Sequence, residues 1–149
     1  MEREIKFRAK DLNEKEWVYG YYVKRPDYSV MIYADVCRKG HPVIVTDPID
    51  SKTVGQFTGL TDTNGKEIYD GDIIREYEDD NTRYGSWERF YVVEYGAYSC
   101  GAHTYYQWNC WEIKDGKKSK SHATLSRHST YNKVVIGNIH DNPELLKTE

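Results

Sequence analysis

At 149 residues and a net charge of −3, the chain is long enough for one domain with a sizeable core. It lacks the overall positive charge that a dedicated duplex-binding protein usually carries. The N-terminus is charged throughout, and the longest apolar runs, 43–45 and 134–136, are far too short to span a bilayer. We therefore expect a cytoplasmic protein with no membrane partner, and the three irregularly spaced cysteines do not suggest a disulfide framework.

Tyrosine is the most abundant aromatic residue, with fourteen copies. It supplies apolar area and a hydroxyl group together, which suits half-exposed sheets and interfaces. This composition predicts a β-rich protein with polar-rimmed surfaces. Ordinary packing within sheets is favoured over a dedicated aromatic recognition surface.

The first part of the chain alternates apolar and polar residues. Residues 3–9 and 17–23 read as two strands of an antiparallel hairpin, and residues 29–36 and 43–46 read as a second pair. We expect these hairpins to form a layer or small lobe over about residues 1–50. Asp50 or Ser51 then either caps a single helical turn or shapes a loop.

The stretch from residue 53 to residue 75 has the highest density of turn signals. A strand at 53–57 is followed by Asn64-Gly65, the preferred pair for a type I′ hairpin turn. Asp70-Gly71-Asp72 is a second turn, after which Ile73 opens a new strand. Two turns so close together predict strongly bent antiparallel sheets or a small barrel-like core over about residues 51–149.

The remainder of the chain continues the β pattern. Residues 87–95, 105–113 and 134–139 are predicted strands, with a turn region of small residues at 96–101. Residues 117–133 are rich in serine, lysine and histidine, which predicts a long exposed loop or a partly disordered insertion. Asp141-Asn142-Pro143-Glu144 is typical of a helix start, so we expect a short C-terminal helix. The fold class predicted is mainly β, in a single domain of residues 1–149.

Three separated motifs resemble one known family. VGQFTGLTDTNGKEIYDGDIIR, at 54–75, resembles the signature of the YopX-like family, small proteins typical of phages and prophages of Gram-positive bacteria. Residues 3–23 and 134–146 resemble the two ends of the same family, around a variable middle at about 76–133. The resemblance implies a mainly β fold, self-association and a phage setting, with no established activity. It brings no catalytic residues with it, and we interpret its signature positions as fold-setting: Gly55, Gly59, Asn64, Gly65, Gly71 and Asp72.

Soft metal ligands gather in the variable middle. Cys100, His103, Cys110, His122 and His128 lie within about thirty residues. The spacing Cys-x2-His-x6-Cys lacks the two tight pairs of a structural zinc site, so we expect neither metal nor cofactor.

Catalysis has little support in the sequence. A thiolate pair would need Cys100 or Cys37 beside a histidine, and nothing brings a specific pair together. Glu67, Asp70 and Asp72 could hold a hard cation or exchange protons, but Asp-Gly-Asp is more simply a turn whose side chains bond backbone amides. Phosphate-loop, dinucleotide and hydrolase motifs are absent, and we predict a protein that is not an enzyme.

The strongest rival hypothesis is single-stranded nucleic-acid binding. A lysine-rich segment follows an aromatic strand, and aromatic faces beside cations can stack bases and meet phosphates. A solvated lysine loop beside a packed strand is favoured over this interpretation. The candidate residues are Lys114, Lys117, Lys118, Lys120, Arg127, Trp108 and Trp111.

The sequence therefore favours a non-enzymatic phage or prophage accessory protein in the host cytoplasm. It would form homo-oligomers and act through a host or phage protein. The aromatic strand around Trp108 and Trp111 is the surface we select for testing, since aromatic residues concentrate in the centres of interfaces.

Overall fold

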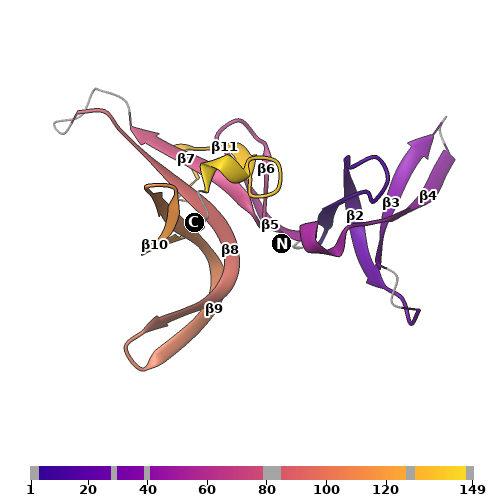
Figure 1. Cartoon of the computed structure of the whole chain (residues 1–149), viewed down its shortest axis with the longest axis horizontal. Helices are drawn as coiled ribbons and strands as arrows, with labels where there is room; N and C mark the ends of the chain where they lie inside the picture. The colour runs from indigo at the N-terminus through magenta and orange to yellow at the C-terminus, as the bar shows by residue number, and fades with distance from the viewer. Residues whose placement is uncertain (1–3, 28–29, 39–40, 79–84, 127–129, 147–149) are drawn as a thin grey trace. The chain divides into compact units, whose positions relative to one another are not determined.

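The computed structural model describes residues 4–27, 30–38, 41–78, 85–126 and 130–146. The described chain is mainly β, as predicted, and its strands are antiparallel in every pair recorded. The elements are β1 (Phe7–Lys10), β2 (Trp17–Lys24), β3 (Val30–Arg38), β4 (His41–Pro48), η1 (Ser51–Thr53), β5 (Gly55–Thr61), β6 (Glu67–Tyr69), β7 (Asp72–Glu78), β8 (Trp87–Cys100), β9 (His103–Lys114), β10 (Lys117–Thr124), β11 (Lys133–Asn138) and η3 (Pro143–Leu145) (Figure 1).

The chain forms two compact units, Met1–Gly59 and Leu60–Glu149. The hydrogen-bonded strand orders are β4-β3-β2-β1-β5-β6 and β10-β9-β8-β7-β11. Strand β5 contains the boundary between the units, since it pairs with β1 at Gly55 and Gln56 and ends at Thr61.

In the first unit, apolar and basic residues alternate along β1, so one face of the strand packs in the core and the other does not. Ala9 is fully buried and clusters with Ile32 and Ile49, and Phe7 packs against this group. The intervening cations lie on the other side of the strand, where the Arg8 guanidinium and the Lys10 amine sit 4.6 and 5.4 Å from the centre of the Trp17 ring. Long basic stems over an aromatic ring let a strand carry charge while its apolar atoms stay covered.

The turn between β4 and β5 resolves an alternative that the sequence leaves open. Asp50 caps η1, because its carboxylate accepts a hydrogen bond from the Lys52 amide at 3.0 Å. Thr53 ties this turn back to β1, since its hydroxyl oxygen accepts the Lys10 amide at 2.8 Å. The single helical turn is therefore present, followed immediately by β5.

In the second unit, one sheet bends around a core. Ile68, Ile74, Tyr91, Val93, Trp108, Cys110, Leu125 and Val135 form the buried cluster. Strands β8 and β9 curve strongly over their length (Figure 1). The described strands do not close into a barrel, because β10 and β11 remain at the two ends of the strand order. Of the two alternatives predicted, strongly bent sheets are correct and the barrel-like core is not.

The expected hairpin at Asn64-Gly65 forms with a different turn. Gly65 has a φ of +80°, but the φ of Asn64 is not positive, so the turn is not type I′. The Gly65 amide donates to the carbonyl of Asp62 at 3.0 Å, and the Asp62 amide donates to the carbonyl of Lys66 at 2.8 Å. This is the pattern of a longer hairpin loop with glycine in the left-handed position. Asp62 favours it, because its carboxylate accepts the amides of Asn64 and Lys66 at 2.8 and 2.9 Å.

Two other predictions are wrong. Residues 117–124 of the expected loop at 117–133 form β10, which pairs with β9 along Trp111 to Asn109 and again at Lys114. The short C-terminal helix is not found in the described residues, where the terminus holds only the 3-10 turn η3. Asn142 precedes that turn without a side-chain capping bond, and its side chain instead contacts Asn138 and Glu144.

Candidate functional site

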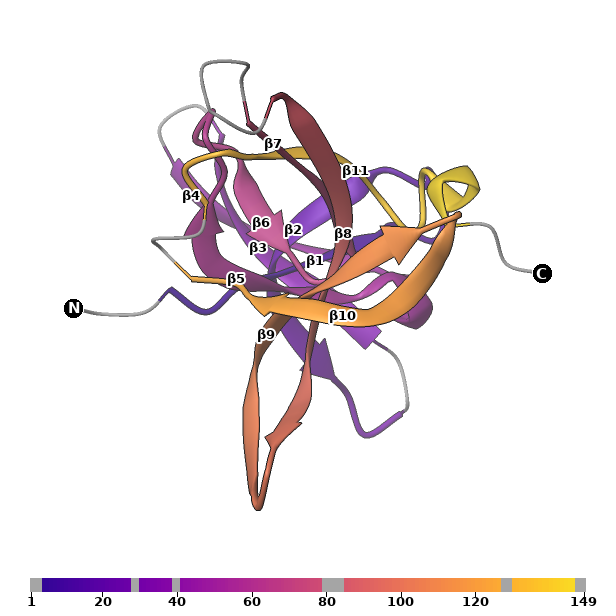
Figure 2. The same ribbon diagram turned by 90° about the vertical axis from the view of Figure 1, so that its left-hand side faces the viewer.

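The most distinctive surface of the second unit is a hairpin that leaves the sheet. Strand β7 pairs with β8 no further than Val92, and β10 pairs with β9 no further than Asn109. Beyond these points, β8 and β9 pair with each other as far as Cys100 and His103. We call residues 95–107 the arm. Figure 2 shows it as a long, narrow hairpin that extends beyond β7, β10 and β11.

The arm carries no charged residue. No Asp, Glu, Lys or Arg occurs between Glu94 and Glu112, although charged residues make up 30% of the chain. At the base of the arm, the Lys118 amine binds the Glu94 carboxylate at 2.8 Å. Glu94 is the last charged residue of β8 before the tip of the arm. The arm thus offers an uncharged surface on a protein of net negative charge.

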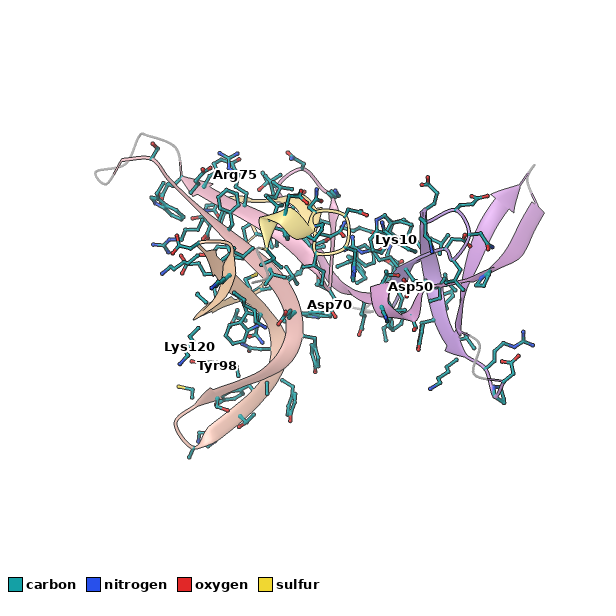
Figure 3. The ribbon with its side chains drawn as sticks, in the orientation of Figure 1. Lys10, Asp50, Asp70, Arg75, Tyr98 and Lys120 are labelled. Carbon is teal, nitrogen blue, oxygen red and sulfur yellow. The ribbon has the colours of Figure 1, made fainter. Side chains whose placement is uncertain are left out.

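Tyrosines are unusually exposed on this hairpin. Tyr95, Tyr105 and Tyr106 are 55%, 52% and 72% exposed. Tyr98 lies across from Tyr105, and Figure 3 shows its side chain on the inner side of the curved hairpin, near Lys120. A two-stranded ribbon is at best marginally stable alone in water, so an arm of this kind gains from being covered.

A buried amide fixes the base of the arm. Asn109 is fully buried, and its side chain donates to the carbonyls of Gly96 and Gln107, both at 3.3 Å. At the tip, Gly101 has a φ of +61°, which suits the first central position of a two-residue hairpin turn. The sequence predicts a turn region at 96–101, but the strand continues through it to Cys100 and the turn is confined to Gly101-Ala102.

The predicted nucleic-acid residues lie partly on β10 and partly in the core. Trp108 belongs to the buried cluster and meets Tyr95 edge to face at 5.2 Å, so its ring does not offer a stacking platform. Lys118 lies 5.5 Å from the centre of the half-buried Trp111 ring, and Lys114 binds Glu112 at 3.1 Å. Lys117 and Lys120 are exposed on the same edge strand. Arg127 lies outside the described residues.

The carboxylates around Gly71 are used by the turn. Asp72 is 1% exposed, and its carboxylate accepts the Tyr69 amide at 2.7 Å. The Tyr69 hydroxyl donates to Glu67 at 2.8 Å. Asp70 is half-buried beside them. The Asp72 carboxylate is thus a hydrogen-bond acceptor for the backbone of its own turn.

Gly71 joins three segments through its backbone. Its amide donates to the carbonyl of Val93 at 2.8 Å, and its carbonyl accepts the Ile139 amide at 2.9 Å. Its φ is +85°, and an added Cβ would lie 3.4 Å from the Ile139 side chain. Both the left-handed backbone and the close approach therefore favour glycine here. Gly59 is also left-handed, while Gly55 is a buried strand position opposite Arg8.

Sequence reasoning missed the buried polar groups that hold this unit together. The Lys133 amine binds Glu76 at 2.7 Å, with side chains only 4% and 16% exposed. The Tyr91 hydroxyl donates to the other oxygen of Glu76 at 2.8 Å. Asp62 reaches the Val135 amide at 2.9 Å. A lysine beginning an apolar strand, as Lys133 does in KVVIG, is the only signal in the sequence that could have indicated such a pair.

The cysteines and histidines separate into different environments. Cys100 and His103 face each other across the tip of the arm and are both exposed. Cys110 is fully buried on the core side, and burial raises the pKa of its thiol to about 12. His122 pairs with Trp111 in the β10–β9 register, and Cys37 with Pro42 in the β3–β4 register, but their side chains and the whole of His128 lie outside the described residues. Among described residues, no three metal-binding side chains converge.

Two surface hollows of the second unit are small. One of about 310 Å³ lies between Tyr77, Trp87 and the Arg75–Glu88 pair, which is bound at 2.8 Å. Another of about 230 Å³ lies between Ile73, Phe90, Ile113 and Leu145. Both lie near or below the lower end of the range for small-molecule sites, roughly 300 Å³. Within the described ranges, no helix is long and apolar enough to cross a membrane.

Comparison with known proteins supports the family resemblance. The family model described as YopX protein matches residues 6–147. The crystal structure of protein EF1440 from Enterococcus faecalis is similar, with 26% sequence identity and a TM-score of 0.54. The alignment covers 98% of this chain and 100% of that one. No curated protein matches the sequence.

Proposed function

Because the chain belongs to the YopX family, we propose that it is a non-enzymatic interaction protein that associates with itself through the arm. The single observation that carries the proposal is the exposure of several tyrosines on a hairpin without charge. Tyrosine provides large, rigid contact area at low entropic cost, and the surrounding Gly, Ala, Ser and Thr residues resemble the composition of adaptable binding loops.

A second copy of the same chain is the partner that this surface fits best. A two-fold contact places one patch against itself, so the patch must be complementary to itself. Charged patches of one sign repel each other in such an arrangement, whereas an uncharged aromatic surface does not. Two chains of net charge −3 therefore meet most favourably at a surface such as the arm.

The biological setting is part of the same proposal. A phage or prophage accessory role in the host cytoplasm is what the family resemblance implies. A host or phage protein would then dock on the assembled protein. The Asp72 carboxylate accepts a hydrogen bond from the Tyr69 amide within the turn, and this structural use supports a role without catalysis.

The proposal is tested by the mass of the protein in solution. We expect the double variant Tyr105→Thr/Tyr106→Thr to be monomeric at concentrations where the unchanged protein is a defined oligomer, measured by light scattering after gel filtration. Threonine retains strand propensity, so the hairpin itself should persist. Tyr21→Thr/Tyr131→Thr is the matched control, because those rings are 58% and 74% exposed outside the arm. A monomeric unchanged protein, or an oligomer unaffected by the arm variant, would overturn the proposal.

Nucleic-acid binding by β10 is the rival proposal. It draws support from Lys117, Lys118 and Lys120 on one exposed edge strand, with Lys118 beside the Trp111 ring. Affinity for a single-stranded oligonucleotide should then fall steeply with salt, and Lys117→Ala/Lys118→Ala/Lys120→Ala should abolish it. Unchanged binding by this triple variant would remove the rival.

A further inference from the structure

The tip of the arm carries a close pair of soft ligands. Cys100 and His103 are directly opposed on β8 and β9, on either side of the Gly101-Ala102 turn. Directly opposed residues of an antiparallel pair have Cβ atoms about 4.5–5.5 Å apart. Both side chains are exposed, and neither belongs to the core of the second unit. The thiol and the imidazole are thus held side by side by the backbone.

This pair corresponds to half of a structural zinc site. Zinc takes four ligands in a tetrahedron, and tight pairs separated by two residues are a common way to supply two of them. The described residues of one chain supply no third ligand at this position. The sequence of one chain lacks a second tight pair of ligands. If the arms of two chains met at their tips, Cys100 and His103 of the second chain would supply that pair.

We propose that two copies of the protein, joined through their arms, bind one zinc ion with Cys100 and His103 of each copy. This rests on the self-association proposed above. The two thiols release their protons on binding, and two thiolates, two neutral imidazoles and one Zn²⁺ have no net charge. The site thereby leaves no uncompensated charge on a surface that carries none elsewhere.

Tyr98 is placed to support the cysteine. It precedes Cys100 by two residues on the same face of β8, and its hydroxyl lies within hydrogen-bonding reach of the Cys100 side chain. Hydrogen bonds from neighbouring groups orient metal ligands and tune their basicity. Tyr98→Phe should therefore weaken zinc binding without removing it.

Zinc titration of the full chain, stripped of metal and kept reduced, tests the inference. We expect one Zn²⁺ per two chains by native mass spectrometry, and a dimer dissociation constant lowered at least tenfold by zinc. Cobalt in place of zinc should give the visible absorption of tetrahedral thiolate coordination. Cys100→Ser and His103→Gln should each remove these effects. His140→Gln, which replaces a half-buried histidine outside the arm, should leave them unchanged.

The outcomes separate the two proposals. Arm-dependent dimers that ignore zinc would overturn the metal site and leave self-association standing. Binding of one Zn²⁺ per chain, or binding that survives Cys100→Ser and His103→Gln, would also overturn it. A protein that is monomeric with and without zinc would contradict both proposals. A monomer that dimerises only with zinc would support the metal site and show that the tyrosines alone are insufficient.

Discussion

At the scale of single residues, the second unit depends on polar groups placed inside it. Lys133, Glu76 and Tyr91 form one hydrogen-bonded group next to apolar side chains of the core. Removing one partner of such a group leaves the other buried without compensation, whereas replacing both can be nearly neutral.

We expect Lys133→Met to lower the free energy of unfolding by about 3–5 kcal/mol, because the mostly buried Glu76 side chain would lose its ion-pair partner. The double variant Lys133→Met/Glu76→Gln should recover part of this loss. Urea unfolding measures both. Arg75→Ala is the control, since the Arg75–Glu88 pair is about half exposed and should contribute no more than about 1 kcal/mol. Equal losses in Lys133→Met and Arg75→Ala would contradict the argument.

Two buried groups predict an alkaline limit on stability. Burial first, and then the bond to Glu76, raise the pKa of Tyr91 to about 12, and burial raises that of Cys110 to about 12. The folded protein holds these two protons more tightly than the unfolded chain. The stabilisation that the protonated Tyr91 and Cys110 side chains provide is therefore complete below about pH 9 and is lost as the pH rises from about 9 toward 12. Tyr91→Phe and Cys110→Ala should each flatten the pH dependence of the unfolding free energy in that window. Tyr131→Phe, at a 74% exposed ring, should leave it unchanged, and identical slopes in all variants would refute the assignment.

At the scale of elements, the lysines of β10 have a structural explanation. This strand is an edge of its sheet, with a register irregularity between Lys118 and His122. Exposed edge strands invite pairing with other chains, and lysines and bulges are common protections against it. The lysine-rich composition that suggests a nucleic-acid-binding loop is thus also typical of an edge strand protected against pairing with other chains.

Replacing these lysines should affect solubility more than stability. We expect Lys118→Val/Lys120→Val to aggregate measurably faster by light scattering at a common concentration, with the unfolding free energy changed by about 1 kcal/mol or less. Arg75→Val tests specificity, because Arg75 is exposed on β7 and is paired there with both β8 and β11. Aggregation of the Arg75→Val protein at the same rate would show that the edge position is irrelevant.

The sequence predicts the strands and turns correctly where they depend on local residue patterns, and incorrectly where they depend on pairing with a distant strand. Alternation at Phe7 and Ala9, and turn signals at Gly65 and Gly71, are local properties, and both hairpin positions follow from them. The arm was missed because Gly96, Ala97 and Ser99 have turn-like composition while their pairing with β9 is set by the strand register. Segment 117–124 was missed because its single partner strand supplies the order that its own composition lacks. The candidate surface depended on both segments, so its location required the structure.

At the scale of the whole molecule, two buried clusters lie in two units. The first contains Ala9, Ile32 and Ile49, and the second is larger. Separate cores are the usual basis for separate cooperative transitions.

We expect two steps in urea unfolding, with the first unit unfolding at the lower concentration. Ile49→Ala should shift only the first step and Ile74→Ala only the second, each by about 2–5 kcal/mol. Trp17 reports on the first unit, and Trp87, Trp108 and Trp111 report on the second. A single transition moved by both variants would show that the units unfold together.

The absence of charged residues from the arm also determines which proteases can cleave it. Trypsin needs lysine or arginine, and none occurs between Arg89 and Lys114, so both strands of the hairpin and its tip remain in one tryptic peptide, Phe90–Lys114. Tryptic digestion of the native protein therefore cannot report on the arm. Chymotrypsin cuts after aromatic residues, and exposed Tyr105 and Tyr106 provide such sites. The ratio of cleavage by these two enzymes consequently distinguishes a covered hairpin from a bare one without any change to the sequence.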